Sequence, residues 1–318
     1  MTTLKTENLF CILGNEMAAQ GAPDCRVGLI GIGLVGTALA ENLLAAGYEV
    51  IGFAPSPASR GKLARLGGRA VESPAHVAAK AARIILSLPD AAVVEQVILG
   101  PGGLLDGSAR PLVILDTTTG EPEKSEALAR LLAAQGIQIL DAPISGSSQQ
   151  IRQRQGVILV GGDRAAYESC LDLIQTLAER FYHLGSSGAG SRAKLASNLI
   201  LGLNRLVLAE GLVFAERLGL DLAAFLAMLK MTPAYSCAVD VKGQKMLQGD
   251  FAPHSKVSQH HKDLRIILEY ADRAGQELPL AALHARLLEE LMAGGEGDLD
   301  TSAVLLALRR LRRGGSVG

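Results

Sequence analysis

The sequence lacks the residue patterns that mark disulfide-rich, zinc-binding and nucleic-acid-binding proteins. It has 4 cysteines in 318 residues, and they are scattered without Cys-x-x-Cys spacing, so neither a disulfide framework nor a zinc site is predicted. The formal net charge is −1, which gives no general attraction for nucleic acid. We interpret the arginines at positions 309, 310, 312 and 313 as a short solvated tail. These features predict a cytoplasmic protein that needs no metal and binds no nucleic acid.

Long apolar runs without charge are also missing. No stretch of 18 residues is free of charged side chains, so no membrane-spanning segment is predicted. Residues 1–25 contain one short apolar run, flanked by Glu7 and Glu16 rather than by basic residues, which does not indicate a signal peptide. We expect this segment to be a disordered extension, or the product of a misassigned start for which Met17 is the alternative. The apolar content of 48% predicts a soluble globular protein of about two domains.

Residues 26–53, RVGLIGIGLVGTALAENLLAAGYEVIGF, follow the pattern of strand, glycine turn, helix and strand. The turn has the spacing GxGxxG, formed by Gly31, Gly33, Leu34, Val35 and Gly36. The first glycine permits the tight turn, the second lets a pyrophosphate approach the backbone, and the third lets the helix lie close to the strand. Because the free N–H groups at the start of the helix favour an anion, this unit predicts a dinucleotide-binding site.

The end of the second strand indicates which coenzyme is preferred. An NAD-specific site commonly has an acidic residue here, whereas this chain has Ala54. The hydroxyl of Ser56 and the cation of Arg60 follow closely, and both suit a 2′-phosphate. We therefore expect NADP to be preferred, with NAD possible. In the alternative interpretation Ser59 only caps the next helix and Arg60 is a solvated first-turn residue.

The remaining pattern predicts a Rossmann-type α/β domain followed by an all-helical domain. Short apolar runs alternate with helical stretches at residues 83–87, 112–116, 138–141, 157–160 and 181–184. Such alternation is typical of a doubly wound, largely parallel sheet with ligands beyond the carboxyl ends of its strands. From residue 190 onward the sequence is almost entirely helical. We place the nucleotide-binding domain at 26–187 and the helical domain at 188–318.

Lys194 and Asn198 are four residues apart in the first turns of a long apolar helix, so they share one face of it. A partly desolvated lysine has a lowered pKa and can transfer a proton near neutral pH, and a neighbouring asparagine can orient the reacting group. The alternative is a lysine at a frayed helix end whose amine reaches to water.

Together these motifs resemble the β-hydroxyacid dehydrogenase family, which includes 3-hydroxyisobutyrate dehydrogenase and tartronate semialdehyde reductase and belongs to the 6-phosphogluconate dehydrogenase superfamily. The resemblance covers residues 26–308 and depends on segments that occur in the family's order, namely GLIGIGLVG, LPD, DTTTGEP, DAPISG, GAGSRAKLASN, HHKDL and GEGDLDTSA. It implies a nucleotide domain, a helical domain, and a cleft between them in which a short carboxylate with a β-hydroxyl meets the nicotinamide.

The resemblance also implies roles for individual residues. Lys194 is expected to be the general acid and base, and Asn198 to bind the reacting end of the substrate. The expected substrate-binding residues are Ser145, Gly146 and Ser147, and the expected coenzyme contacts beyond the glycine turn, Ser56 and Arg60 are Leu88, Pro89, Thr119 and Lys262. In the alternative interpretation, Asp116 and Asp141 only end strands and have no role in the site. We interpret His260 and His261 as the solvent-exposed face of a helix.

One segment departs from the family pattern. Residues 145–156 read SGSSQQIRQRQG, where many relatives have SGG followed by small residues. The added side chains, Ser147, Ser148, Gln149 and Arg152, either recognise a longer or more polar acid or decorate an exposed helix start.

The sequence therefore favours an NADP-preferring enzyme that acts on a short β-hydroxyacid or its semialdehyde. A cationic lysine donates the proton when the carbonyl is reduced, and a neutral lysine accepts it when the alcohol is oxidised. The alternatives are a non-catalytic NADP-binding module used for assembly and an imine reductase. The apolar helical segments around 199–214 and 283–291 predict a homodimer or homotetramer formed through the helical domain.

Overall fold

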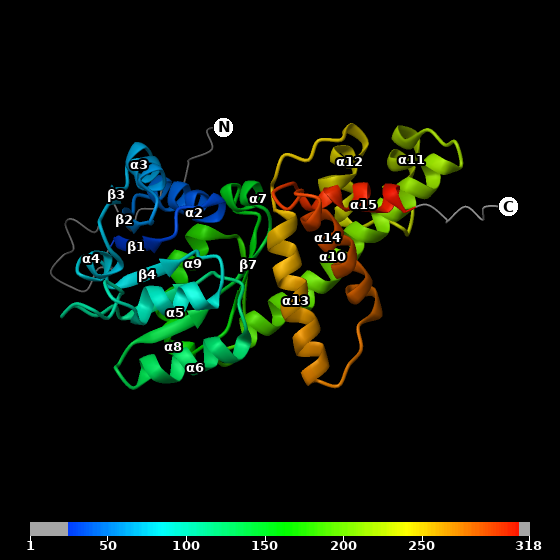
Figure 1. Cartoon of the computed structure of the whole chain (residues 1–318). Coiled ribbons are helices and arrows are strands. Elements are labelled where there is room, and N and C mark those ends of the chain that lie inside the picture. Colours follow the sequence, from blue (N-terminus) through cyan, green and yellow to red (C-terminus); the bar gives the residue numbers. More distant parts are fainter. Residues whose placement is uncertain (1–24, 312–318) are drawn as a thin grey trace, which may run out of the picture. The chain divides into compact units, whose positions relative to one another are not determined.

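The computed structural model describes residues 25–311, which form two compact units (Figure 1). The first unit ends at Lys194 and the second begins at Leu195. The predicted extension of residues 1–25 lies outside the described residues except for Cys25, and so does the end of the predicted tail from residue 312 onward.

The first unit contains a six-stranded sheet in which all neighbouring strands are parallel, in the order β3-β2-β1-β4-β5-β6. The strands are β1 (Arg26–Ile30), β2 (Glu49–Phe53), β3 (Arg69–Ala70), β4 (Arg83–Leu86), β5 (Val113–Asp116) and β6 (Gln138–Asp141). The first strand, β1, lies in the middle of the sheet; from there the chain extends to β3 and then crosses back to β4 to build the other half. This doubly wound arrangement confirms the predicted fold class.

Helices cover both faces of this sheet, which explains why its strands are apolar and buried rather than alternating with polar residues. Leu29 packs in one cluster with residues of α2 and α9, whereas Ile30 packs in another with residues of α4, α5 and α6. Figure 1 shows these helices around the strands. Their bounds are α2 (Leu34–Ala45), α3 (Pro57–Arg65), α4 (Pro74–Ala78), α5 (Ala91–Leu99), α6 (Pro122–Ala133) and α9 (Leu171–Leu177).

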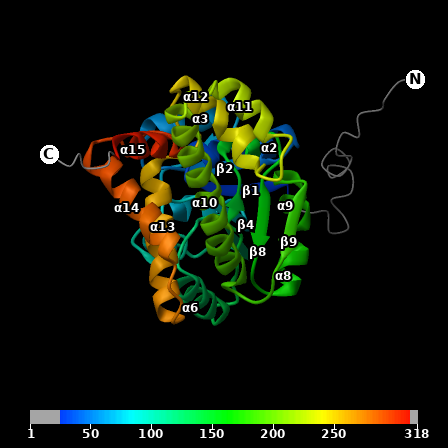
Figure 2. The same cartoon turned by 90° about the vertical axis from the view of Figure 1, so that its right-hand side faces the viewer.

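The last strands of the first unit form a separate sheet of three strands, in the order β7-β8-β9. These are β7 (Ile144–Ser145), β8 (Val157–Val160) and β9 (Arg180–His183), with α7 (Ser148–Arg152) and α8 (Arg164–Ser169) between them. Figure 2 shows β8 and β9 side by side. The prediction that these runs continue one largely parallel sheet was wrong, because β7 and β8 are antiparallel and, in the described residues, the strand pairing of β6 with this region is limited to the isolated bridge of Asp141 with Gly161.

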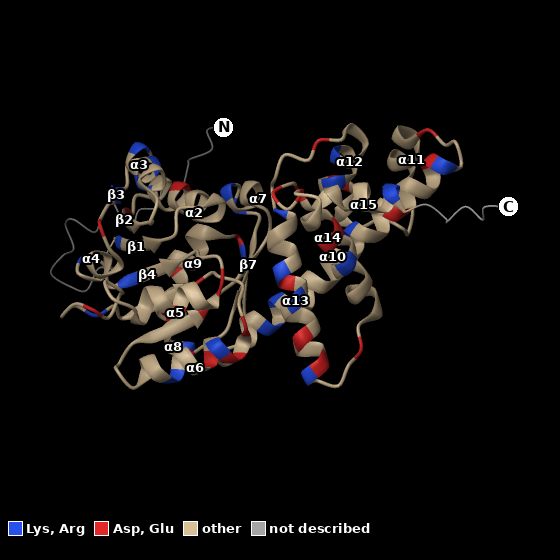
Figure 3. Cartoon of the chain, in the orientation of Figure 1, with Lys and Arg blue, Asp and Glu red and all other residues tan. Residues whose placement is uncertain are grey.

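The described part of the second unit is helical throughout. Its helices are the greater part of α10 (Ala189–Arg217), α11 (Leu222–Leu229), α12 (Gln244–Gln248), α13 (Val257–Arg273), α14 (Pro279–Ala293) and α15 (Val304–Arg310), with a π-helical turn at Val239–Gly243 and a 3-10 turn at Thr301–Ala303. Gly219, Gly249 and Gly275 have φ values of +76°, +65° and +68°, and they lie where helices end because glycine adopts this conformation without strain. Both signs of charge are interspersed along α13 (Figure 3).

Two parts of this unit differ from what the sequence suggested. Arg309 and Arg310 lie in the last turn of α15 and not in an irregular tail, and their exposed side chains form ion pairs with Glu216 and Glu296.

Among the described helices, α10 is long and apolar enough by composition alone to cross a membrane. A core helix of a globular protein has the same properties, and one face of α10 is packed into the core of the second unit.

The loops of the second unit converge on one buried carboxylate, Asp300, which is 0% exposed. Its two oxygens accept hydrogen bonds from Lys242 Nζ at 2.7 and 2.9 Å, and further bonds from the backbone N–H groups of His254 and Ser302. Burial by itself would raise the pKa of Asp300, but the lysine and the hydrogen bonds lower that pKa to about 2. The ion pair therefore ties the π-helical turn to the loops before α13 and α15.

Asp300→Asn is expected to reduce the free energy of unfolding by about 3 to 5 kcal/mol, because it leaves the Lys242 ammonium buried without its counter-charge. The folded pKa of about 2 lies below the ordinary value of 3.8. The stabilisation is therefore present above the ordinary pKa and is lost as the pH falls through about 2. Urea unfolding measures the effect. The control is Asp298→Asn, which breaks the exposed pair with Lys256 and should cost at most about 1 kcal/mol; equal losses in the two variants would contradict the prediction.

Candidate active site

The glycine turn joins β1 to α2 and has the geometry of an anion-binding turn. A Cβ on Gly31, whose φ is +96°, would lie 2.1 Å from the carbonyl oxygen of Ser87, and a Cβ on Gly36 would lie 1.9 Å from that of Gly31. Both positions therefore exclude any side chain. Gly33 is different, because nothing lies within 4 Å of the Cβ position. It is the N-cap of α2 and has no side chain to occupy the helix start, so the N-terminus of this helix offers open space and N–H groups for a phosphate.

The guanidinium of Arg60 lies at the end of β2. Arg60, in the first turn of α3, donates from Nη1 to the carbonyl oxygens of Ala54 at 2.7 Å and Pro55 at 2.9 Å. Ser56 is the N-cap of α3, and its side chain makes no capping hydrogen bond. The alternative interpretation was wrong for Ser59, which lies within α3 and does not cap it; Arg60 does lie in the first turn, partly exposed, with its guanidinium on the strand end.

The loops that follow β4 and β5 are tied to one another. The N–H of Leu88 donates to Thr118 Oγ1 at 3.2 Å, and the N–H of Thr118 donates to Asp116 Oδ1 at 3.0 Å. Burial raises the pKa of Asp116 to about 7, the hydrogen bonds from Thr118 oppose this rise, and the nearby charge of Asp141 adds to it. These bonds place the predicted contacts Leu88, Pro89 and Thr119 on two connected loops at the carboxyl edge of the sheet.

Lys194 lies beside the predicted substrate-binding loop. Its side chain is 6% exposed, and Nζ donates to the carbonyl oxygen of Ile144 at 2.8 Å. Ile144 immediately precedes Ser145 and Gly146, and Gly146 has a φ of +152°. The alternative of a lysine reaching to water was therefore wrong. The structure brings Lys194, Ser145 and Gly146 together within the first unit.

The residues that depart from the family pattern have structural partners. Ser147 and Gln150 form a capping box at the start of α7, and Ser148 is buried. Arg152 pairs with Glu41 of α2, with Nε and Oε2 2.6 Å apart. These contacts favour a helix start over recognition of a larger acid, and they leave the hydroxyl of Ser147 already engaged in the cap.

Within the second unit, Asn198 and Lys262 share a partner, Asp263, that the sequence did not single out. Asn198 is 5% exposed, and its Nδ2 donates to Asp263 Oδ2 at 3.0 Å. Lys262 Nζ lies 3.3 Å from Asp263 Oδ1. Asp263 follows Lys262 in the motif HHKDL, and that adjacency was the only signal for it.

The prediction that His260 lies on the solvent-exposed face of its helix was wrong. His260 is 4% exposed, and its ring centroid lies 5.1 Å from that of His284. Val257, His260, Leu264 and Ile267 are all buried at helical spacing on α13, so His260 lies on the inner face and not in solvent. Burial and the charge of Arg205 lower the pKa of His284 to about 3, which keeps that ring neutral. His261 is half-buried near Glu289.

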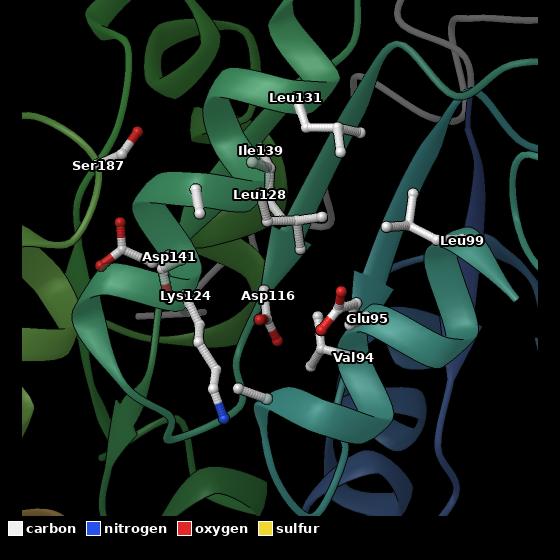
Figure 4. Close-up of a pocket in the computed structure, with 13 residues that line it drawn as sticks. Val94, Glu95, Leu99, Asp116, Lys124, Leu128, Leu131, Ile139, Asp141 and Ser187 are labelled. Carbon is white, nitrogen blue, oxygen red and sulfur yellow. The ribbon is translucent and has the colours of Figure 1, made fainter.

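A pocket of about 140 Å³ lies between α5 and α6, beneath the ends of β5 and β6. Its lining includes Asp116, Asp141, Lys124 and several apolar side chains, as Figure 4 shows. The glycine turn and Lys194 do not line it. Among residues 25–311 no group of three or more His, Cys, Asp or Glu side chains could hold a metal ion.

Comparison with known proteins identifies the family. The model of the NAD-binding domain of 6-phosphogluconate dehydrogenase matches residues 26–185, and the NAD-binding model of NADP-dependent 3-hydroxyisobutyrate dehydrogenase matches residues 188–308. The chain belongs to the β-hydroxyacid dehydrogenase family. It is therefore an NAD(P)-binding oxidoreductase, as the sequence predicted.

Individual members of this dehydrogenase family cover nearly the whole chain. The 2-(hydroxymethyl)glutarate dehydrogenase of Eubacterium barkeri is 34% identical over 88% of this chain and 93% of its own. The 2-hydroxy-3-oxopropionate reductase of Escherichia coli is 32% identical over 89% and 97%. Among solved structures, Mycobacterium tuberculosis 3-hydroxyisobutyrate dehydrogenase with L-serine is similar at a TM-score of 0.79, with 27% identity over 89% of this chain and 99% of that chain.

Proposed function

We propose that this dehydrogenase prefers NADP and interconverts a short β-hydroxyacid and its semialdehyde, with Lys194 as the general acid and base. The observation that carries the proposal is the buried amine of Lys194, held on the Ile144 carbonyl beside Ser145 and Gly146. A lysine fixed at this place can exchange a proton with an oxygen bound at the adjoining loop.

The residues of the first unit fit a dinucleotide. The open N-terminus of α2 at Gly33 suits the pyrophosphate, and Arg60 with Ser56 suits the 2′-phosphate of NADP. When bound, the coenzyme supplies or accepts the hydride. The protein's own contribution is to bind the acid, orient its oxygen and move the proton. An ammonium on Lys194 donates as the carbonyl gains negative charge, and the neutral amine accepts in the reverse direction.

The substrate class follows from chemistry that the named relatives share. 2-(Hydroxymethyl)glutarate, 2-hydroxy-3-oxopropionate and 3-hydroxyisobutyrate each have a hydroxyl or carbonyl on the carbon β to a carboxylate. We propose that Ser145 and Gly146 bind this carboxylate, and that Asn198, held by Asp263, binds the reacting end. Retention of a buried lysine favours this enzyme over a non-catalytic assembly module and over an imine reductase.

Lys194→Ala is expected to lower kcat by about 10²- to 10⁴-fold while the Kd of the coenzyme stays nearly unchanged, because the proton transfer is lost but the nucleotide contacts remain. A screen of small hydroxyacids and semialdehydes, followed by coenzyme absorbance, provides the assay. Lys124→Ala removes an exposed lysine of the same unit and serves as the matched control. If the Lys194 variant keeps turnover within a few-fold of wild type, the assignment is wrong.

We also propose that the enzyme forms a homodimer or homotetramer through the exposed face of α10. Ile200, Val207, Phe214 and Leu218 are 60 to 64% exposed. With Asn204 and Gly211 between them, these positions are spaced alternately four and three residues apart, which is the spacing of a helix-packing seam. Glycine within a helix costs about 0.5 to 1 kcal/mol relative to alanine. Nothing lies within 4 Å of the Cβ position of Gly211. The space beside this glycine can therefore admit a side chain of a second copy.

Val207→Glu with Phe214→Glu should convert the oligomer to monomers, because the carboxylates would be buried in an apolar seam. Sedimentation velocity at micromolar concentration measures the mass. Leu112→Glu is the control, since Leu112 in the first unit is 63% exposed and lies far from this helix in the sequence. A wild-type protein that sediments as a monomer, or a double variant that keeps the wild-type mass, would rule out the seam.

The coenzyme preference is tested at the end of β2. NADPH is expected to bind at least about ten times tighter than NADH, because one charge-assisted contact to phosphate contributes roughly 1.5 to 3 kcal/mol. Arg60→Ala should remove most of that difference, whereas Arg65→Ala in the last turn of the same helix should not. Fluorescence titrations at fixed ionic strength compare the three proteins. Equal affinities in the wild type, or a preference unchanged by Arg60→Ala, would show that Arg60 does not bind the phosphate.

A further inference from the structure

Asp141 connects β6 to the helix that carries Lys194. It is the last residue of β6 and is 5% exposed. Its Oδ1 accepts the N–H of Gly188 at 2.8 Å, and its Oδ2 accepts the N–H of Ser191 at 2.8 Å. Both donors lie at the N-terminus of α10, where backbone N–H groups have no acceptor within the helix. A carboxylate there also balances the positive end of the helix dipole.

The same junction is closed by main-chain packing. Asp141 and Gly161 exchange backbone hydrogen bonds at 3.0 and 2.8 Å. A Cβ on Gly190 would lie 2.2 Å from the carbonyl oxygen of Leu159, and a Cβ on Gly161 would lie 2.7 Å from the nitrogen of Gly190. The first turn of α10 therefore rests directly on the ends of β6 and β8, with no room for a side chain between them.

Lys194 lies one helical turn beyond Ser191, so the position of its amine depends on this junction. The segment from Asp141 to Ile144 holds α10 at two points. The carboxylate of Asp141 binds the backbone of the first turn, and the carbonyl of Ile144 accepts from Nζ at 2.8 Å. The same segment leads directly into Ser145 and Gly146. A shift of the first turn would therefore move the amine relative to the loop proposed to bind the substrate carboxylate.

We propose that Asp141 is a positioning residue for Lys194, which fixes the distance between the amine and the substrate-binding loop without touching the reacting atoms. The inference rests on the proposed role of Lys194 as acid and base. Asp141 does end a strand, as the alternative stated, but both of its oxygens are used on α10. Burial raises the pKa of Asp141, and the N–H bonds from Ser191 and Gly188 oppose that rise.

The test is a double-mutant cycle on kcat with Asp141→Asn and Lys194→Ala. The asparagine keeps the shape and one acceptor but turns an amide group toward a backbone N–H. It is expected to lower kcat by about 10- to 100-fold, with KM and the coenzyme Kd within about threefold of wild type, because a misplaced general acid affects the chemical step. In the Lys194→Ala background the same substitution should change kcat by less than about twofold, since the group that Asp141 positions is already gone.

Asp163→Asn is the matched control, because Asp163 also caps a helix of the first unit, with its Oδ1 2.9 Å from the nitrogen of Ala166. It should leave kcat unchanged. If Asp141→Asn does not fold, Ser191→Pro removes the N–H bonded to Oδ2 in a first turn that tolerates proline, and it enters the same cycle.

The outcomes separate the two claims. If Lys194→Ala retains wild-type kcat, the proposed function fails and the positioning role fails with it. If Lys194→Ala is impaired but Asp141→Asn lowers kcat equally in both backgrounds, or lowers it no more than Asp163→Asn does, only the positioning role is overturned. Loss of coenzyme binding in Asp141→Asn with intact secondary structure also overturns it.

Discussion

Direct contact between main-chain atoms is the constraint on which the first unit depends. Gly36 packs on the carbonyl of Gly31, and Gly190 packs on the carbonyl of Leu159. In each case a Cβ on the glycine would lie less than 2.5 Å from the carbonyl oxygen. The first contact sets how α2 leaves β1 and where its N–H groups lie. The second fixes the direction in which α10 extends from the sheets, and with it the position of the Lys194 backbone. The nucleotide turn and the proposed proton donor are thus placed by the same means, a helix start pressed against strand ends.

Two buried aspartates show how charge is accommodated differently in the two units. Asp300 has a lysine counter-charge, so its ionised form is stabilised and its pKa falls to about 2. Asp141 has backbone N–H groups instead, and burial outweighs them, so that its pKa rises. A paired charge mainly holds loops together, whereas a carboxylate on a helix start also determines the direction of that helix.

The sequence predicted the features that depend on local spacing. The GxGxxG turn, the parallel strands and the helical second unit were all recognisable, because apolar runs and glycine positions reflect local geometry. It could not assign β7, β8 and β9 to a second sheet, since an apolar run does not specify its neighbours. His260 was misplaced because its burial depends on the ring of His284 and the space beside Gly202, which are distant in the sequence. Asp263 was missed because its bond to Asn198, which lies 65 residues earlier, forms only in the folded unit.

Because the two units divide within α10, the protein cannot be separated into them at a loop. Lys194 is the last residue of one unit and Leu195 the first of the next, yet both belong to one continuous helix. No loop is available there for a cut or an insertion. A fragment that stops before Ala189 would keep the nine strands found in residues 25–311 but lose the lysine, and one that stops at Lys194 would end in the middle of a helix. Circular permutation or separate expression must therefore break the chain elsewhere, for example at a loop between the helices of the second unit.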